Sequence, residues 1–508
     1  MTFFSPEFVL AFLLFLMIYW AFRSSVLIQK ILILLASYGF MCSINPHFAL
    51  LLAAYSMFIY FAGVCICYAN RVSVRISLPA KQSSRKKKLS RKAAAKQARK
   101  SKQAQQIAAP TAKALVVMLA AVAASLFFLA FFKYYEFIRE AFNAFLGTLG
   151  IVAVDSVAFP LGISYYVFMS ITYLVSVYRR ECGEQGFLSL ACFLAFFPSV
   201  VMGPIGRASA AKRIEPVLPQ FDAPKRFGNA DEIYVLVIFS LIKLLIVSSY
   251  LGSYVSGLFS GVYGDVPESS AVQILIAVLL YGAVLYTNFS GFIDMARALG
   301  LAMGFNLPQN FNMPYVARSL GEFWDRWHIS LSTFIRDYIY IPLGGSRRGF
   351  ARTCLNLIIA FALSGIWHGV GLNFLIWGLL HGVGIVFLKW RAGLGARPLN
   401  PHLALFCTYA YVSFAWIFFA NSSFGDAMAI FSGFARAQAF HDIGEPAVLA
   451  AVIAGIFAYP KTAGLQGWLV KFFSGVSFLP KALLLGAILT LIFALMPSGI
   501  PNFIYAGF

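Results

Sequence analysis

The sequence predicts an all-α protein that crosses a membrane many times as one polytopic domain. Of its 508 residues, 60% are hydrophobic and 12% are charged, and the mean hydropathy is +0.79. Soluble domains carry roughly 25% charged residues, so this chain cannot cover a water-facing surface of its size. A soluble enzyme is therefore excluded. The length allows roughly 11–13 spans of about 20 residues with connecting loops.

A series of apolar segments is long enough to span a bilayer. They lie at 3–22, 26–44, 47–69, 114–133, 156–178, 231–251, 271–291, 353–371, 373–390, 402–420, 444–459 and 482–498. The stretch 184–203 is apolar too, but it contains Pro198 and runs into Gly203 and Pro204. Because Pro and Gly leave backbone groups that lipid cannot satisfy, we predict a re-entrant or protein-packed segment there. The first segment has no basic n-region and no small-residue cleavage site, so we expect it to be retained.

The net charge of +21 is concentrated in one loop. Residues 71–113 hold fourteen Lys or Arg and no Asp or Glu. The low-complexity segment Lys81–Lys102 predicts a cytoplasmic orientation signal that rests on anionic lipid, each basic residue contributing about 1 kcal/mol. No stacking aromatics are interleaved with this charge, so we expect no nucleic-acid binding. An arm that recruits a protein partner is the alternative interpretation.

The positive-inside rule sets the orientation. Arg23 and Lys30 lie near the junction of the first two spans, and the basic loop follows the third, which places the N-terminus outside. Continued alternation, with 184–203 re-entrant, puts the other basic loop residues on the cytoplasmic side. They are Arg179, Arg180, Arg207, Lys212, Arg213, Arg347, Arg348, Lys389, Arg391 and Lys461.

The sequence has no pattern typical of a metal or nucleotide enzyme. The seven cysteines fall mostly in apolar runs, and Cys65 and Cys67 point to different sides of a helix, so we predict no metal site and no disulfide framework. Walker, GxSxG and HExxH motifs are absent from the sequence. A second catalytic step outside the membrane would need another protein.

Charged and aromatic side chains are concentrated in Gly321–Gly345. Polar groups at membrane depth are costly and usually serve a purpose. On one helix, Trp324 and His328 would share a face, an imidazole beside an indole wall, while Asp325 and Arg326 would project elsewhere. An interfacial helix with an aromatic belt explains the same residues.

A second histidine lies in Ser364–Gly369, inside or at the end of an uncharged run. Burial disfavours the imidazolium, so His368 is expected to be neutral and able to take a proton, as a general base must. Gly365 and Gly369 leave room for a neighbouring helix or a substrate to approach the backbone. The alternative is a histidine that only packs between helices, which is the role we predict for His381.

Five blocks of this chain resemble the membrane-bound O-acyltransferase (MBOAT) family, and above all its bacterial branch that acetylates envelope polysaccharides. The central blocks are FWDRWHISLSTFIRDYIYIPLGG and SGIWHG. Supporting blocks lie at Pro160–Arg179, Met202–Arg207 and Thr287–Tyr315, and together they cover about 160–390 in the expected order. Departures from the family pattern are Asp325, Asn288 and the long Lys-rich loop.

The resemblance implies many helices, with re-entrant and interfacial ones, around a central tunnel with a cytoplasmic and an opposite funnel. It implies His368 as the catalytic residue and His328 as a catalytic or tunnel-shaping one. The residues expected at the substrate are Trp324, Trp367, Arg326 and Arg336, the arginines near CoA phosphates unless they pair with Asp325 or Asp337. The expected donor is acetyl-CoA, with no permanently bound cofactor.

The implied reaction is acetyl transfer across the bacterial inner membrane to a polysaccharide hydroxyl, directly or through an exported SGNH-type partner. We expect N-terminal spans in 1–70, the basic loop in 71–113, the catalytic core in 114–395 and C-terminal spans in 396–508. Alternatives are transfer of D-alanine or another acyl group from a carrier protein, a glycan-precursor transporter, and a non-catalytic scaffold whose basic arm recruits a synthase.

Overall fold

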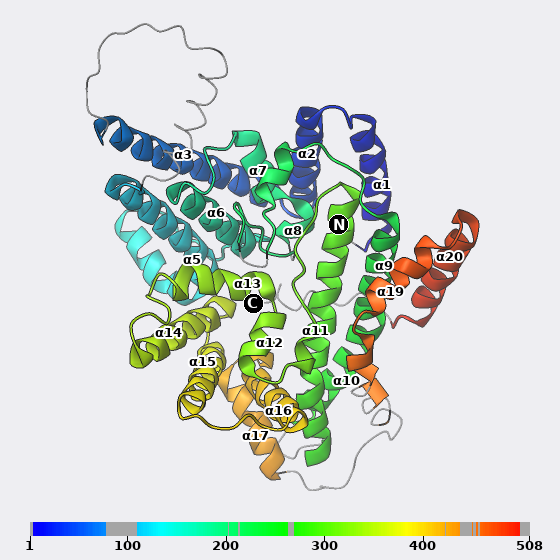
Figure 1. Ribbon diagram of the computed structural model, residues 1–508. Helices are drawn as coiled ribbons and strands as arrows, with labels where there is room; N and C mark the ends of the chain where they lie inside the picture. Colours follow the sequence, from blue (N-terminus) through cyan, green and yellow to red (C-terminus); the bar gives the residue numbers. More distant parts are fainter. Residues whose placement is uncertain are drawn as a thin grey trace, which may run out of the picture. The chain divides into compact units, whose positions relative to one another are not determined.

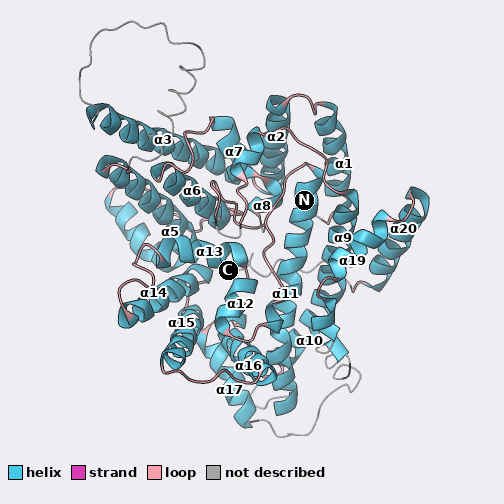
Figure 2. Cartoon of the chain, viewed as in Figure 1, coloured by secondary structure: helices cyan, strands magenta, loops and turns pink. Residues whose placement is uncertain are grey.

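In the part of the chain that the structure describes, the regular structure consists of helices, as the sequence predicts (Figures 1 and 2). The computed structural model describes residues 4–77, 109–201, 203–211, 214–262, 269–421, 423–436, 450, 454–455 and 458–497. The chain divides into two compact units. Unit 1 comprises 1–201, 205–226 and 303–307, and unit 2 comprises 202–204, 227–302 and 308–508.

Unit 1 is built around α6, whose residues are almost all buried and which packs against α3 and α5. Ser and Thr hydroxyls on α6 donate to carbonyls of their own helix, which satisfies them inside an apolar core. The helices of unit 1 are α1 (Pro6–Ala21), α2 (Val26–Ile44), α3 (Pro46–Ser77), α5 (Ala112–Thr148), α6 (Ile163–Tyr178), α7 (Phe187–Ala195), α8 (Phe197–Val200) and η1 (Leu218–Asp222).

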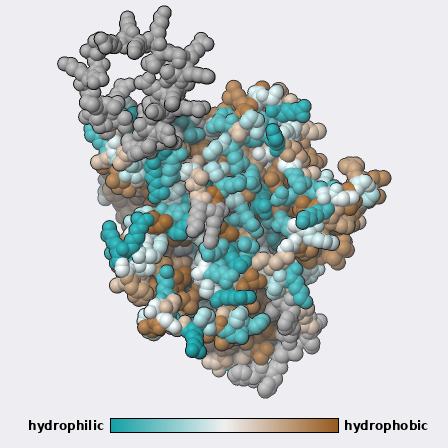
Figure 3. Space-filling model, in the orientation of Figure 1, coloured by the Kyte–Doolittle hydropathy of each residue, from teal (hydrophilic) through white to brown (hydrophobic). Residues whose placement is uncertain are grey.

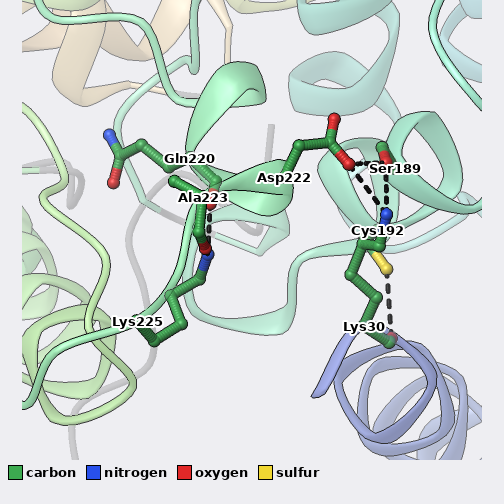
Figure 4. Close-up of polar contacts among 7 residues, drawn as sticks. All are labelled: Lys30, Ser189, Cys192, Gln220, Asp222, Ala223 and Lys225. Atoms are coloured by element: carbon green, nitrogen blue, oxygen red, sulfur yellow. Dashed lines mark hydrogen bonds and ion pairs between the residues drawn. The ribbon is translucent and has the colours of Figure 1, made fainter. Parts of the chain in front are cut away.

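A polar cluster ties α2, α7 and η1 together (Figure 4). The Lys30 ammonium lies 2.8 Å from Asp222 Oδ1 and 3.0 Å from Ser189 Oγ, and the Ser189 hydroxyl donates to the same carboxylate. Burial raises the pKa of Asp222, but the hydrogen bonds from Lys30 and Ser189 outweigh it and hold that pKa below its usual value. Lys225 donates to two nearby backbone carbonyls. The cluster thus gives partners to charges that burial alone would penalise.

Unit 2 is organised on the long helix α11, against which α9, η2, α10, α16 and α17 pack. A second pair, α14 and α15, forms the other large helix contact of this unit. The helices are α9 (Ala230–Leu241), η2 (Ile242–Ser248), α10 (Ser249–Ser260), α11 (Ala271–Ala302), η3 (Pro314–Val316), α12 (Leu320–Arg326), α13 (Ile329–Ile335), η4 (Arg336–Tyr340), α14 (Phe350–His368), α15 (Leu372–Gly393), α16 (Pro401–Ala420), α17 (Phe424–Arg436), η5 (Tyr459–Thr462), α19 (Leu465–Ser474) and α20 (Phe478–Leu495).

The described part of the chain contains nine helices that are long and apolar enough to cross a membrane, and α1 and α6 are shorter apolar helices. These helices make the chain a multi-pass membrane protein. Figure 3 shows hydrophobic side chains gathered over α20, where Leu479, Leu483 and Leu491 are exposed. Lipid contact explains such exposure. The predicted span 444–459 lies mostly outside the described residues, and Lys81–Lys102 lies wholly outside them.

The segment 184–203 does not form a spanning helix, which confirms the prediction that it is not a regular span. It forms two short helices, α7 and α8, separated at Phe196, with Pro198 in the first turn of α8. Residues 189–200 are all buried, and α7 packs against α2, α3 and α6. The backbone groups that the break leaves are therefore covered by protein, as they must be at membrane depth.

Candidate active site

The segment that carries His328 is broken into two short helices. α12 ends at Arg326, Trp327 is extended, and α13 begins at Ile329. His328 lies between them in the left-handed conformation, with φ 41° and ψ 55°. The prediction that Trp324 and His328 share a face of one helix is therefore wrong. A non-glycine residue in this conformation costs roughly 1–2 kcal/mol, so its surroundings must impose it.

Asn310 holds the break at His328 and is itself fully buried. Its backbone carbonyl accepts the Ile329 N–H at 2.9 Å, and its side-chain Oδ1 accepts the Ser330 N–H at 2.9 Å. A continuous helix would direct both N–H groups to carbonyls four residues earlier. Instead the Arg326 carbonyl accepts the Asn312 N–H at 2.9 Å. A distant loop has thus replaced the local helical hydrogen bonds.

The same asparagine, Asn310, determines which ring nitrogen of His328 carries the proton. Because Asn310 Oδ1 faces Ser330, the amide NH2 group faces His328, and Nδ2 lies 3.3 Å from Nδ1. Nδ1 is then an acceptor, so the neutral ring carries its proton on Nε2. Burial lowers the pKa of His328 to about 3, which keeps the ring neutral across the physiological range. In this state Nε2 is a hydrogen-bond donor.

His368 is the last residue of α14, and only 3% of it is exposed. Its ring contacts Trp367, Trp377 and Phe419, with centroids 4.5, 4.9 and 5.1 Å away. The chain leaves the helix at Gly369, where a Cβ atom would lie 2.2 Å from the ring of Phe374. The close approach of that ring explains the glycine after the histidine.

Glycines bring α14 and α15 into close contact, as the small-residue spacing predicts. A Cβ atom at Gly365 would lie 2.2 Å from the Phe374 carbonyl oxygen, and one at Gly378 would lie 2.3 Å from the Phe361 carbonyl oxygen. At Gly382 the nearest atom, the Ile358 Cα, would be 3.3 Å away. The backbones therefore touch at this crossing, which sets the position of His368.

A continuous series of ring contacts joins His328 to His368 within unit 2. Each neighbouring pair of rings has centroids between 4.8 and 5.8 Å apart. The rings that follow His328 are Phe289, Phe311, Trp327, Trp416 and Trp377, and Trp377 contacts His368. We call His328, His368 and these rings, with His381 and Trp324, the aromatic cluster.

His381 lies inside the aromatic cluster with none of its surface exposed. Its ring packs against Trp324 and Trp377, with centroids 5.0 and 5.1 Å away. It also accepts a hydrogen bond at Nδ1 from the indole N–H of Trp324, at 3.3 Å. The structure therefore adds a specific polar contact to the packing role that the sequence predicts.

Comparison with known proteins gives the chain its family. The family model of membrane-bound O-acyltransferases (MBOAT) matches residues 121–394, more than half of the chain. The chain belongs to this family. The match includes both His328 and His368, and it falls within the segment 114–395 that we predict as the catalytic core.

Several curated proteins are similar to this chain over part of their length. A probable alginate O-acetylase of Pseudomonas putida is 35% identical over 51% of this chain and 52% of that protein. A peptidoglycan O-acetyltransferase of Helicobacter pylori is 30% identical over 60% of this chain and 62% of its own. A teichoic acid D-alanyltransferase of Bacillus subtilis is 27% identical over 43% and 55%. The chain spans about half the length of the first of these relatives.

The arginines predicted at the substrate are paired with carboxylates in this MBOAT chain. Arg326 contacts Glu322 Oε1 at 2.8 Å and donates to the Asn312 carbonyl, so it has an ion-pair partner, Glu322, that we did not predict from the sequence. Arg336 contacts Asp337 Oδ1 at 2.9 Å. This is one of the two pairings that we predict from the sequence as the alternative to contact with CoA phosphates. The contact of both arginines with a substrate stays a prediction, and so does that of Trp324 and Trp367.

Sequence reasoning missed Asn310 and several members of the aromatic cluster. Asn310 lies in a loop without periodicity, and nothing in the sequence connects it with His328. Trp377 and Trp416 fall in ordinary apolar spans, where a tryptophan is expected as packing. In the described residues, no group of three or more His, Cys, Asp or Glu side chains could hold a metal ion.

Proposed function

We propose that this chain is an O-acyltransferase of the bacterial inner membrane. It moves an acetyl group from cytoplasmic acetyl-CoA to a hydroxyl of a cell-envelope polysaccharide of the alginate or peptidoglycan type, or to an exported SGNH-type partner. The observation that carries the proposal is the pair of buried histidines, His328 and His368, which share one aromatic cluster and both lie in the family-matched segment. The names of the two O-acetylating relatives support the acetyl group and the acceptor class.

The protonation states of the buried histidines support His368 as the base. His328 and His381 both use Nδ1 as an acceptor, from Asn310 and Trp324 respectively. Each neutral ring then presents N–H at Nε2 and has no second nitrogen to accept a proton. His368 is the remaining buried histidine of the described residues. We therefore assign the general base to His368 and a donor role to His328.

The proposed step is attack of an acceptor hydroxyl on the thioester carbonyl. His368 takes the hydroxyl proton as the new C–O bond forms. The C–S bond then breaks, and the CoA thiolate leaves with the proton from His368. General-base help contributes typically about 10²–10⁴-fold, whereas orientation of both reactants can contribute about 7–11 kcal/mol. Positioning by the aromatic cluster therefore outweighs proton transfer in this proposal.

Donor competition tests the proposal. The purified full-length chain, in lipid vesicles with the SGNH-type partner and glycan, is given labelled acetyl-CoA or D-alanine loaded on a carrier protein. We expect label in the glycan or partner from acetyl-CoA alone. Label from the D-alanyl carrier alone would replace acetyl transfer by the activity named for the third relative. No label from either donor, in folded protein with active partner, would contradict acyl transfer.

The orientation is proposed from the basic loop and is tested separately. A cysteine introduced into Lys81–Lys102, in a chain whose native cysteines are replaced by serine, is treated with an impermeant maleimide in intact spheroplasts. We expect labelling after lysis only. Labelling in intact spheroplasts would place the loop outside and overturn the proposed cytoplasmic donor side. Removal of the basic residues is expected to weaken binding to vesicles that contain anionic lipid.

A further inference from the structure

Three ring N–H groups in the aromatic cluster are buried with no hydrogen-bond acceptor among the described residues. They are Nε2 of His381 and Nε1 of Trp377 and Trp416. Each of these residues is at most 1% exposed. Buried polar groups in native proteins are nearly always hydrogen-bonded, so an exception marks an unseen ligand, a bound water or a functional role.

The three N–H groups belong to rings that contact one another. The centroid of His381 lies 5.1 Å from that of Trp377 and 6.3 Å from that of Trp416, and the two indoles stack at 5.8 Å. His381 and Trp377 come from α15 and Trp416 comes from α16. A ligand that satisfies them must bring acceptor atoms, because an indole N–H can only donate.

Trp324 makes His381 a donor as well. Its indole N–H donates to Nδ1, so that nitrogen carries no proton and the neutral ring holds its proton on Nε2. A histidine kept only as an aromatic spacer would not need a tryptophan to fix its tautomer. The hydrogen bond thus directs the donor capacity of His381 to the nitrogen that lacks an acceptor.

We propose that His381, with Trp377 and Trp416, forms a donor site for the carbonyl oxygen of the acyl group. The site adjoins the assigned base, because the Trp377 ring contacts both His381 and His368. When the acceptor hydroxyl attacks, the carbonyl oxygen gains negative charge, and N–H donors stabilise it until the C–S bond breaks. This inference rests on the proposed acyl transfer at His368 and adds the groups that stabilise its transition state.

Substitution of His381 tests the donor site. His381→Phe retains an aromatic ring and removes both nitrogens, His381→Gln retains an acceptor and a donor, and Trp416→Phe removes one indole N–H. His402→Phe, at an exposed position of α16, is the control. We expect His381→Phe to lower kcat about 10²–10³-fold, with only the smaller rise in KM for acetyl-CoA that loss of the ground-state hydrogen bond causes. His381→Gln should recover part of that loss, and Trp416→Phe should lose less.

A binding measurement separates this inference from the proposed function. Calorimetry on the reconstituted full chain compares the affinity for acetyl-CoA with the affinity for CoA, which lacks the carbonyl of the acetyl thioester. We expect tighter binding of acetyl-CoA and loss of that preference in His381→Phe. The inference would be overturned if folded His381→Phe had the wild-type kcat or still bound acetyl-CoA more tightly than CoA. His381 would then only pack against its neighbours or bind a water. A third outcome is that His381→Phe loses the preference for acetyl-CoA while the wild-type chain transfers no acetyl group. That outcome would reject the proposed function and retain the donor site.

Discussion

The side-chain amide of Asn310 contacts His328 and Ser330 at the same time, with Nδ2 3.3 Å from His328 Nδ1 and Oδ1 2.9 Å from the Ser330 nitrogen. One residue thereby sets both the backbone break and the tautomer of the histidine. Since the three positions are joined by these two bonds, changes at Asn310 are expected to act on His328 through geometry and protonation together.

Asn310→Asp should lower the rate of acyl transfer while the stability of the fold changes little. A carboxylate still accepts the Ser330 N–H, but it cannot donate to Nδ1 and favours a proton there. We expect kcat to fall about 10–100-fold, as misplaced groups in active sites commonly cause. Asn310→Ala removes both bonds and should also cost about 1–3 kcal/mol of unfolding free energy. Wild-type kcat in Asn310→Asp would show that the tautomer of His328 has no role.

Burial of His328 predicts a loss of stability in acid. Its pKa is about 3 in the folded protein and about 6.5 in the unfolded chain. Between these values the unfolded chain binds more protons, so the free energy of unfolding falls as the pH decreases from about 6.5 toward 3. His328→Asn tolerates the left-handed backbone and does not titrate. Its Tm in detergent should fall less between about pH 7 and pH 4, and an unchanged slope would contradict the assignment.

Gly365→Ala should separate α14 from α15 and displace His368. The new methyl group would lie 2.2 Å from a backbone oxygen that no side-chain rotation can move. We expect a loss of about 1–3 kcal/mol in unfolding free energy and reduced transfer. Gly39→Ala is the matched control, because no atom lies within 4 Å of a Cβ there and alanine favours the helix. Equal Tm values for the two variants would show that the crossing is loosely packed.

The ion pair of Lys243 and Asp294 joins η2 to α11 inside two membrane-spanning helices, at 2.6 Å. Lys243→Met or Asp294→Leu alone leaves an unpaired charge and should cost about 3–5 kcal/mol. The double variant removes both charges and should recover most of that loss. Thermal unfolding in detergent measures all three. Additive losses in the double variant would mean that the two side chains do not stabilise each other.

The sequence predicts the spans well where hydrophobicity decides the structure. The expected span 26–44 coincides with α2, and 402–420 differs from α16 by one residue. The sequence underestimates the length of α5 and α11. These helices extend to Thr148 and Ala302 because the charged side chains near their ends find partners that hydrophobic periodicity does not show. Arg139 pairs with Glu136 on the same helix, whereas Arg297 pairs with Glu232 of α9.

The sequence predicts which histidines form the site, but it does not predict how they are arranged. The histidine blocks stand out in the sequence, but the break between α12 and α13 has no glycine or proline to mark it. Contacts with Asn310, eighteen positions from His328, override the local preference for one helix. The role of His381 is equally non-local, because its hydrogen bond comes from Trp324, fifty-seven positions away.

Removal of the imidazole at position 368 tests the central claim most directly. The full chain carrying His368→Ala is compared with wild type and with His402→Ala, whose histidine is exposed, for transfer of label from acetyl-CoA at equal amounts of folded protein. We predict that His402→Ala retains wild-type transfer and that His368→Ala loses about 10²–10⁴-fold in kcat. Full transfer by folded His368→Ala would contradict the assignment of the general base.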